Sequence, residues 1–143
     1  MKTLVEAINE GLHHEMGRDG SLLVMGEDVG RSGGVFRVTA GLQERFGGDR
    51  CVDTPLAEAG ILGTAIGLGM VGWRPVVEMQ YDAFSYPSLE QLITHVGRYR
   101  WRSGGRMNLP LTIRMPYGGG VNAPELHEES PETYYVHTAG IKV

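Results

Sequence analysis

The sequence predicts an α/β fold in which a mostly parallel sheet carries helices on both faces. Apolar runs of strand length alternate along the chain with segments whose apolar residues recur at helical spacing. The apolar runs contain few polar residues, as expected for parallel strands covered on both sides. Glycine accounts for 22 of the 143 residues, about twice its usual share of about 7%. This excess indicates tight turns and close backbone packing.

Local signals define the elements of the first half of the chain. Apolar residues recur at helical spacing from Leu4 to Met16 behind a Thr3-x-x-Glu6 capping box, and Arg18-Asp19-Gly20 ends this helix. Leu22 to Met25 predicts a strand, and Gly26 to Gly34 predicts a loop. The next predicted elements are a helix from Val38 to Phe46, a strand from Arg50 to Asp53, and a helix that opens at Thr54-Pro55 and runs towards Trp73.

The second half continues the same alternation. Pro75 to Met79 predicts a strand, and Ser88-x-x-Gln91 is a capping box for a helix with an apolar face that extends to Tyr99. Leu111 to Met115 predicts a further strand, followed by a long loop that begins at Gly118-Gly119-Gly120 and a short helix that begins at Ser130-Pro131-Glu132. Because Ile141 to Val143 starts another apolar run, we expect the chain to be truncated inside its last strand.

Composition and charge limit the classes of function. A chain of 143 residues suggests one domain. A net charge of −4 argues against a nucleic-acid surface, and Arg98, Arg100, Arg102 and Arg106 are interpreted as a solvated helix end. The single cysteine, Cys51, excludes an internal disulfide and a multi-cysteine zinc site, and we expect it to be a buried, inert thiol. No metal-ligand spacing is present.

The N-terminus lacks the pattern of a signal peptide. The uncharged stretch from Ala59 to Trp73 is shorter than the roughly 20 residues that span a bilayer. We therefore expect a cytoplasmic protein that does not bind a membrane.

The parallel topology predicts where a functional site would lie. In open α/β sheets, ligands bind beyond the carboxyl ends of the strands. Glu27-Asp28, Thr54 to Glu58, Gln80 to Phe84 and Met115 to His127 each follow a predicted strand. These segments should therefore converge on one edge of the sheet.

Two side chains in these segments are candidates for chemistry. Glu58 stands at the mouth of a long apolar, glycine-rich stretch, and burial of an unpaired carboxylate is costly. It is either a functional acid or an ordinary acid at a helix N-terminus, where the helix dipole favours it. His127 lies in a glycine- and acid-rich loop and is either a surface residue or a functional one. No glycine-rich phosphate-binding motif is present.

The order of motifs resembles one family along essentially the whole chain. The matching strings are Gly26-Glu27-Asp28-Val29-Gly30, Gly34 to Thr39, Asp53-Thr54-Pro55-Leu56-Ala57-Glu58-Ala59-Gly60, Arg74 to Glu78, Tyr99 to Gly105, Arg114 to Gly120, His127-x-x-Ser130-Pro131-Glu132, and His137-Thr138-x-Gly140-x-Lys142-Val143. They resemble the β subunit of the E1 component of 2-oxoacid dehydrogenase complexes. The resemblance implies that residues 1–143 are an incomplete N-terminal pyrimidine-binding domain of the thiamine-diphosphate-binding fold, with the C-terminal transketolase-like domain absent.

The resemblance also implies a cofactor and a reaction. Glu58 matches the glutamate that hydrogen-bonds N1′ of the aminopyrimidine of thiamine diphosphate, and Phe84 matches the aromatic residue that packs on that ring. Glu27, Leu56 and Gln80 match residues that line the same pocket, and His127 matches a histidine that assists acyl transfer to the lipoyl group of E2.

The diphosphate and Mg²⁺ are expected on an α subunit in an α2β2 assembly. The reaction is then oxidative decarboxylation of a 2-oxo acid, and this chain alone should be inactive.

Two alternatives remain open at this point. The first is another thiamine enzyme of the transketolase class, which the continuous run of E1-like motifs argues against. The second is a non-catalytic interaction domain of the same fold, which the joint presence of Glu58, Phe84 and His127 argues against. The loop around His127 departs from the family pattern, because Asn122 to Leu126 and Glu128-Glu129 replace a glycine-rich, Ser/Gln-containing sequence found in many relatives.

Overall fold

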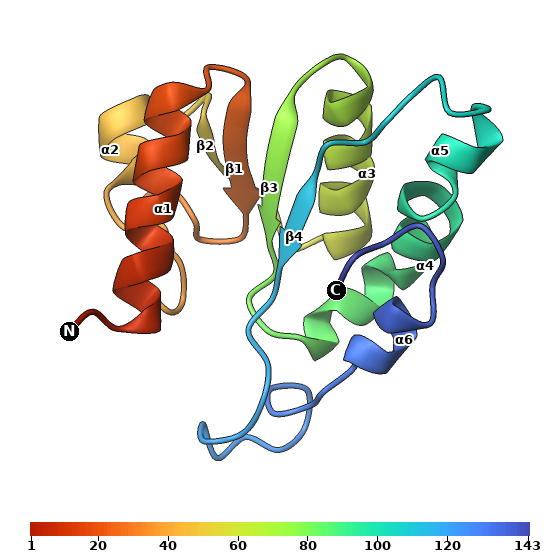
Figure 1. Ribbon diagram of the computed structural model, residues 1–143. Coiled ribbons are helices and arrows are strands. Elements are labelled where there is room, and N and C mark those ends of the chain that lie inside the picture. Colours follow the sequence, from red (N-terminus) through yellow and green to blue (C-terminus); the bar gives the residue numbers. More distant parts are fainter.

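The structure, a computed structural model, describes all residues from Met1 to Val143 and is built on one parallel sheet (Figure 1). Its strands are β1 (Leu22–Gly26), β2 (Cys51–Asp53), β3 (Arg74–Glu78) and β4 (Thr112–Arg114), in the order β2-β1-β3-β4. Every neighbouring pair is parallel. The predicted fold class is therefore confirmed.

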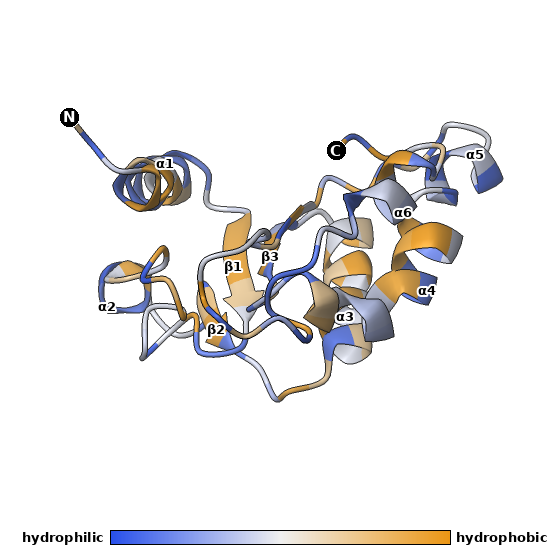
Figure 2. Ribbon diagram, turned by 90° about the horizontal axis from the view of Figure 1, so that it is seen from below, coloured by the Kyte–Doolittle hydropathy of each residue, from blue (hydrophilic) through white to orange (hydrophobic).

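Helices cover both faces of the sheet (Figures 1 and 2). On one face lie α1 (Leu4–Arg18) and α2 (Leu42–Phe46). On the other face lies α3 (Glu58–Met70), which packs against β3 and against η1, a 3-10 helix (Ala83–Ser88). The same side carries α4 (Leu89–Gln91), the π-helical turn η2 (Leu92–Val96), α5 (Tyr99–Arg102) and α6 (Glu132–Val136). None of these helices combines the length and the apolar character needed to cross a membrane.

Two apolar clusters fix the layers. The cluster under α1 and α2 contains Met16, Val24, Val29, Leu42 and Cys51. The larger cluster lies under α3 and consists of Leu23, Met25, Ile61, Leu62, Ala65, Ile66, Val77, Met79, Leu92 and Tyr135. Successive residues of β1 alternate between the two clusters, as the period of two in a strand requires. Removal of this apolar surface from water is the main stabilising contribution of each layer.

The predicted capping box of α1 is confirmed. The Thr3 hydroxyl accepts from the backbone N–H of Glu6 at 3.2 Å, and the Glu6 carboxylate accepts from the backbone N–H of Thr3 at 2.8 Å. The two bonds satisfy amide groups that would otherwise lack partners at the helix start.

The predicted start of the helix at Val38 is wrong, as is that of the helix at Thr54-Pro55 described below. The segment from Val38 begins with turns, and α2 starts only at Leu42, because Gly41 adopts a left-handed φ of 77°. Asn9 of α1 also binds the carbonyl oxygens of Val38 and Ala40, at 2.7 and 3.0 Å. These bonds hold the segment in its turn conformation.

The helix predicted to open at Thr54-Pro55 starts at Glu58 instead. Thr54 donates its N–H to the carbonyl of Gly26 at 2.9 Å, which prolongs the sheet pairing beyond β2. The chain can enter α3 only after this extended segment, so the acid becomes the first residue of the helix.

The expected helix from Ser88 is broken into shorter pieces. Ser88 does not cap it, because the Ser88 hydroxyl donates to the carbonyl of Ser85 at 2.7 Å. The α-helical pitch is interrupted by η2 and by a turn before α5.

The glycine excess predicts close backbone packing, which the glycines after Glu58 show only in part. A Cβ added at Gly69 would lie 3.5 Å from Leu109 and 3.7 Å from Pro110, in the segment before β4, whereas one added at Gly67 or Gly72 would meet no atom within 4 Å. The partner of Gly69 is thus a loop, and Gly72 lies beyond the end of α3. Ile141 to Val143, expected to start a strand, forms none.

Cys51 is buried, as predicted, and its reactivity towards thiol reagents should therefore depend on pH. Desolvation, followed by the nearby charges of Asp53 and Glu78, raises the pKa of the thiol to about 11. At pH 8 only about a thousandth of such a thiol is ionised, against about a quarter for a free cysteine. At pH 8 we expect a thiol reagent such as Ellman's reagent to label Cys51 only after unfolding. Labelling of the folded protein should become measurable only as the pH approaches 11. Rapid stoichiometric labelling of the folded protein at pH 8 would contradict this.

Candidate functional site

Predicted site residues from three neighbouring strands lie at the carboxyl edge of the sheet, the side viewed in Figure 2. Glu27 directly follows β1, Gln80 lies two residues after β3, and Glu58 begins α3 after β2. Phe84 lies in η1, which packs against α3. The parallel register places Gly26 opposite both Asp53 and Glu78, so the loops that follow start side by side. The predicted convergence of these segments is therefore observed.

Glu27 and Glu58 are two buried acids at this edge of the sheet. Each residue is only 8% exposed, and the Oε1 atom of Glu27 is buried without a hydrogen-bond partner. Burial raises the pKa of Glu27, and the charges of Glu58 and then Asp28 raise it further. The charge of Glu58 is thus near enough to act on the Glu27 carboxyl group. An unpartnered buried carboxyl oxygen is an open position for a hydrogen-bonding ligand.

The location of Glu58 has a local cause. The preceding residue, Ala57, provides no side-chain cap, so the free N–H groups of the first turn of α3 face the helix entrance. The helix dipole favours a carboxylate there even though the residue is buried. Helix-end stabilisation and a functional role are therefore compatible for this acid.

Gln80 joins the loops that follow β1 and β3. Its side-chain amide donates to the Asp28 carboxylate at 3.0 Å. Asp28 adopts a left-handed φ of 56°, and its carbonyl accepts from the N–H of Gly34 at 2.7 Å. The turn beside Glu27 is thus held from two sides.

Phe84 and His127 meet in an aromatic cluster. The His127 ring lies 5.0 Å from that of Phe84 and 4.5 Å from that of Tyr81, both edge-to-face, and Tyr81 also contacts Phe84 and Phe36. His127 Nδ1 lies 2.8 Å from the carbonyl oxygen of Glu125. Because a carbonyl can only accept, Nδ1 carries the proton, and Nε2 is the free acceptor of the neutral ring.

Leu56 is placed differently from the other predicted site residues. It lies in the segment between β2 and α3 and is 77% exposed. Such a large exposed apolar side chain would form a pocket wall only if another surface covered it. Its assignment to the cofactor pocket stays a prediction.

Three contributors to this edge were not foreseen from the sequence. Asp53 accepts from the N–H groups of Gly30 and Arg31, at 2.6 and 3.1 Å, and thereby ties the loop after β1 to the end of β2. Tyr81 links Phe36 to Phe84 and His127. The sequence feature that could have identified Tyr81 is its position as an aromatic residue in the segment that follows the buried strand β3. Glu78 forms a 3.0 Å ion pair with Arg114 across β3 and β4. The pair could have been found only from the register of these strands.

The close contact between Asp53 and Gly30 predicts that a larger residue at position 30 destabilises the fold. A Cβ added at Gly30 would lie 2.7 Å from Asp53 Oδ2 and 2.2 Å from the Gln43 amide nitrogen. We expect Gly30→Ala to lower the free energy of unfolding by about 1–3 kcal/mol, because the loop must shift away from its anchor. Chemical unfolding monitored by circular dichroism measures this, with Gly48→Ala as the matched control, since Gly48 has open space around it. Equal stabilities of the two variants would contradict the tight contact.

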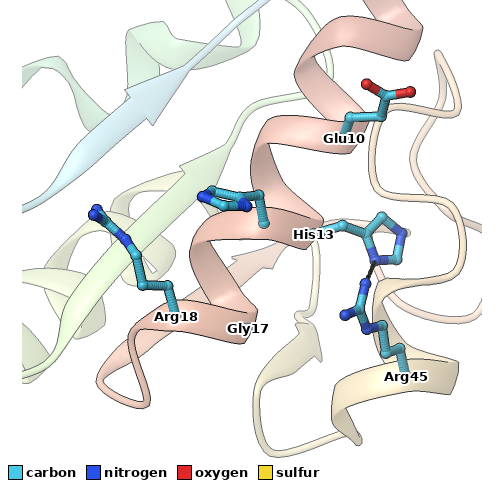
Figure 3. A pocket seen from close by; sticks show the side chains of 6 residues that line it. Glu10, His13, Gly17, Arg18 and Arg45 are labelled. Atoms are coloured by element: carbon cyan, nitrogen blue, oxygen red, sulfur yellow. Dashed lines mark hydrogen bonds between the residues drawn. The ribbon is translucent and has the colours of Figure 1, made fainter.

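Two cavities lie away from Glu27 and Glu58. One, of about 730 Å³, is a polar groove between α1 and α2 lined by Glu10, His13, His14, Gly17, Arg18 and Arg45 (Figure 3). In it, Arg45 lies 3.4 Å from His13 Nδ1. The other, of about 770 Å³, runs beside β4 and is lined by η2, α6 and the C-terminal residues. None of the predicted site residues lines either cavity. The structure contains no group of three or more His, Cys, Asp or Glu side chains arranged to hold a metal.

Comparison with known proteins is consistent with this geometry. The chain is 52% identical over 141 residues to the 3-methyl-2-oxobutanoate dehydrogenase subunit beta of Mycobacterium tuberculosis, covering 99% of this chain and 40% of the relative. It is 51% identical over 140 residues to the pyruvate dehydrogenase E1 component subunit beta of Leifsonia xyli (98% and 42% covered). It is 52% identical over 141 residues to the subunit of the same name from Bacillus subtilis (99% and 43%). The chain thus spans about two fifths of the length of these relatives.

The match to a family model covers the entire chain. Residues 1–143 match the model described as the pyrimidine binding domain of transketolase. The parallel sheet with helices on both faces agrees with that assignment. The chain therefore belongs to the transketolase pyrimidine-binding domain family.

Proposed function

We propose that this chain is the pyrimidine-binding part of the β subunit of a 2-oxoacid dehydrogenase E1 component. The subunit would catalyse oxidative decarboxylation of a 2-oxo acid and transfer of the acyl group to the lipoyl group of E2. The observation that carries the proposal is the burial of both Glu27 and Glu58, with an unpartnered oxygen on Glu27, at the carboxyl edge of the sheet. The names of the relatives, which include pyruvate and 3-methyl-2-oxobutanoate dehydrogenases, support the class of substrate.

The two buried acids fit the aminopyrimidine ring of thiamine diphosphate. A ring nitrogen and an exocyclic amine are complementary to carboxyl groups in a water-poor site. When bound, thiamine diphosphate supplies a carbon nucleophile and an electron sink for decarboxylation. Glu58 would share a proton with N1′ and thereby control the protonation of the ring. Glu27, with its raised pKa, would donate or accept a further hydrogen bond.

The other predicted site residues would orient the ring and serve the second half of the reaction. Phe84 would pack on the pyrimidine, and Gln80 would hold the loop beside Glu27 through Asp28. Leu56 would complete the pocket once a partner subunit covers its exposed side chain. His127, with Nδ1 held by the Glu125 carbonyl, would present Nε2 to the lipoyl group and, when the ring is protonated, deliver the Nε2 proton to the lipoyl sulfur that does not take the acyl group.

The assembly around this chain is part of the same proposal. An α subunit would bind the diphosphate and Mg²⁺, and two copies of each subunit would form an α2β2 enzyme in the cytoplasm that docks a lipoyl-bearing E2. In the full-length β subunit, residues 1–143 would belong to the N-terminal domain, followed by a transketolase-like C-terminal domain.

Reconstitution tests this proposal. The full-length β subunit is combined with its α subunit, thiamine diphosphate and Mg²⁺, and a panel of 2-oxo acids is assayed with an artificial electron acceptor. We expect decarboxylation of at least one member of the panel, and none when the α subunit is left out. If the complete assembly decarboxylates no 2-oxo acid but still associates, a non-catalytic interaction domain is the better interpretation. Ketol transfer between sugar phosphates would instead support another enzyme of the transketolase class.

A further inference from the structure

Two acids follow His127 in the sequence, and their side chains hold the loop that carries it. The carboxylate of Glu128 accepts from three consecutive backbone N–H groups, those of Gly120, Val121 and Asn122, at 2.8 Å for Gly120 and 2.6 Å for Asn122. The carboxylate of Glu129 accepts from the Tyr86 hydroxyl and lies 3.4 Å from the N–H of Leu126. The loop from Gly120 to Glu128 is therefore closed at its base.

The backbone of this loop needs such an anchor. Asn122 and Leu126 have positive φ angles of 61° and 66°. For leucine this conformation costs free energy and persists only where the surroundings impose it. The three amide bonds also lower the pKa of Glu128, with the Asn122 N–H as the largest cause. Bonds from backbone amides to an ionised carboxylate are about twice as strong as neutral ones.

The loop is tied to the aromatic side of the candidate site. Tyr86, the partner of Glu129, lies in η1 two residues from Phe84, on which the His127 ring packs. The Tyr86–Glu129 bond fixes the loop to η1, whereas Glu128 fixes the loop to itself. Both restraints act on residues directly after His127 in the sequence.

We propose that Glu128 is a positioning residue that holds His127 against Phe84 by binding the amides of Gly120, Val121 and Asn122. The inference rests on the proposed function, in which His127 serves reductive acylation. In that step two electrons from the decarboxylated substrate reduce the lipoyl disulfide, one sulfur takes the acyl group, and the other takes a proton to become a thiol. Glu128 touches none of these reacting atoms and acts through the position of His127.

The test separates this step from decarboxylation in the full α/β assembly. One assay measures decarboxylation with an artificial electron acceptor, which needs no lipoyl group, and a second measures acylation of a lipoyl domain. We expect Glu128→Ala to reduce the ratio of acylation to decarboxylation by about tenfold or more, since small displacements of a catalytic group have large effects. Glu128→Gln keeps an acceptor oxygen in the same place and should recover part of the loss.

Hydrogen exchange provides a readout that does not depend on activity. The amides of Gly120, Val121 and Asn122 should exchange faster in Glu128→Ala, and to an intermediate extent in Glu128→Gln. Glu125→Gln is the matched control, since it removes one exposed negative charge on the other side of His127. Any change that Glu125→Gln causes in the ratio of acylation to decarboxylation measures the effect of charge alone. In this control, the amides of Gly120, Val121 and Asn122 should exchange at the rates of the unsubstituted protein.

The possible failures can be told apart. If Glu128→Ala exchanges faster but its ratio matches that of Glu125→Gln, Glu128 anchors the loop without positioning His127, and the inference is wrong. Unchanged exchange would overturn the anchoring itself. An unsubstituted assembly with no decarboxylation would refute the proposed function, and the exchange measurement would still test the anchor.

Discussion

Glu58→Gln should reduce decarboxylation by the assembled enzyme by about 10²–10⁴-fold, the range for loss of a group that manages protons in catalysis. The two side chains have the same size, and an uncharged residue is easily accommodated at a buried helix start. An amide, however, cannot exchange a proton with a ring nitrogen as a carboxyl group does. The loss should therefore appear in kcat, with a much smaller change in the affinity for thiamine diphosphate.

Steady-state kinetics and calorimetric titration of the cofactor measure the two quantities separately. The matched control is Glu44→Gln, which removes an exposed acid in the first turn of α2, on the opposite face of the sheet. It should change kcat by less than about twofold. If Glu58→Gln is as active as this control, Glu58 does not exchange a proton with the cofactor ring. This conclusion does not depend on the roles of the other site residues.

Arg114→Met should lower the free energy of unfolding by about 3 kcal/mol, at the lower end of the range of about 3–5 kcal/mol for a broken buried ion pair. The Glu78 side chain is only 5% exposed, and Arg114 Nε lies 3.0 Å from its Oε2 atom. Without the guanidinium, the carboxylate of Glu78 is left buried and unpaired in β3. The Arg114 side chain retains 21% exposure, so water can relieve part of this cost.

A second substitution tests the cause. Glu78→Gln combined with Arg114→Met removes the stranded charge and should recover much of the lost stability, because a neutral pair of similar volume is tolerated in the interior. Arg98→Met, which removes an exposed arginine, should lie within about 0.5 kcal/mol of the unsubstituted protein. The quantity to measure is the urea midpoint of the assembled subunits. If the double variant is less stable than Arg114→Met alone, the ion pair is not the source of the loss.

The sequence was a good guide to the layers and a poor guide to helix starts. Apolar periodicity identified all four strands to within about two residues, because burial on both faces leaves a plain signal. The starts of α2 and α3 were misplaced because the decisive contacts are long-range, namely the bonds from Asn9 to Val38 and Ala40 and from Thr54 to Gly26. Such contacts join residues far apart in the sequence, so local helix propensity cannot predict them.

The candidate site divides in the same way. Glu27, Glu58, Gln80 and Phe84 could be found from their positions after strands and from a family resemblance. Asp53 and Glu128, by contrast, hold the loops around the site through hydrogen bonds from backbone amides, Asp53 from Gly30 and Glu128 from the loop of His127. Any acidic side chain can accept such bonds, so they cannot be predicted from a pattern of residue types. Leu56 shows the converse, since its proposed role depends on a surface that this chain does not provide.

A crystal structure of the α/β assembly with thiamine diphosphate and Mg²⁺ would show whether the Glu58 carboxyl group faces N1′ of the bound aminopyrimidine. We expect a separation of about 2.6–3.2 Å between an Oε atom of Glu58 and N1′, with the ring packed on Phe84. A cofactor bound elsewhere, or a Glu58 side chain turned away from the ring, would contradict this assignment.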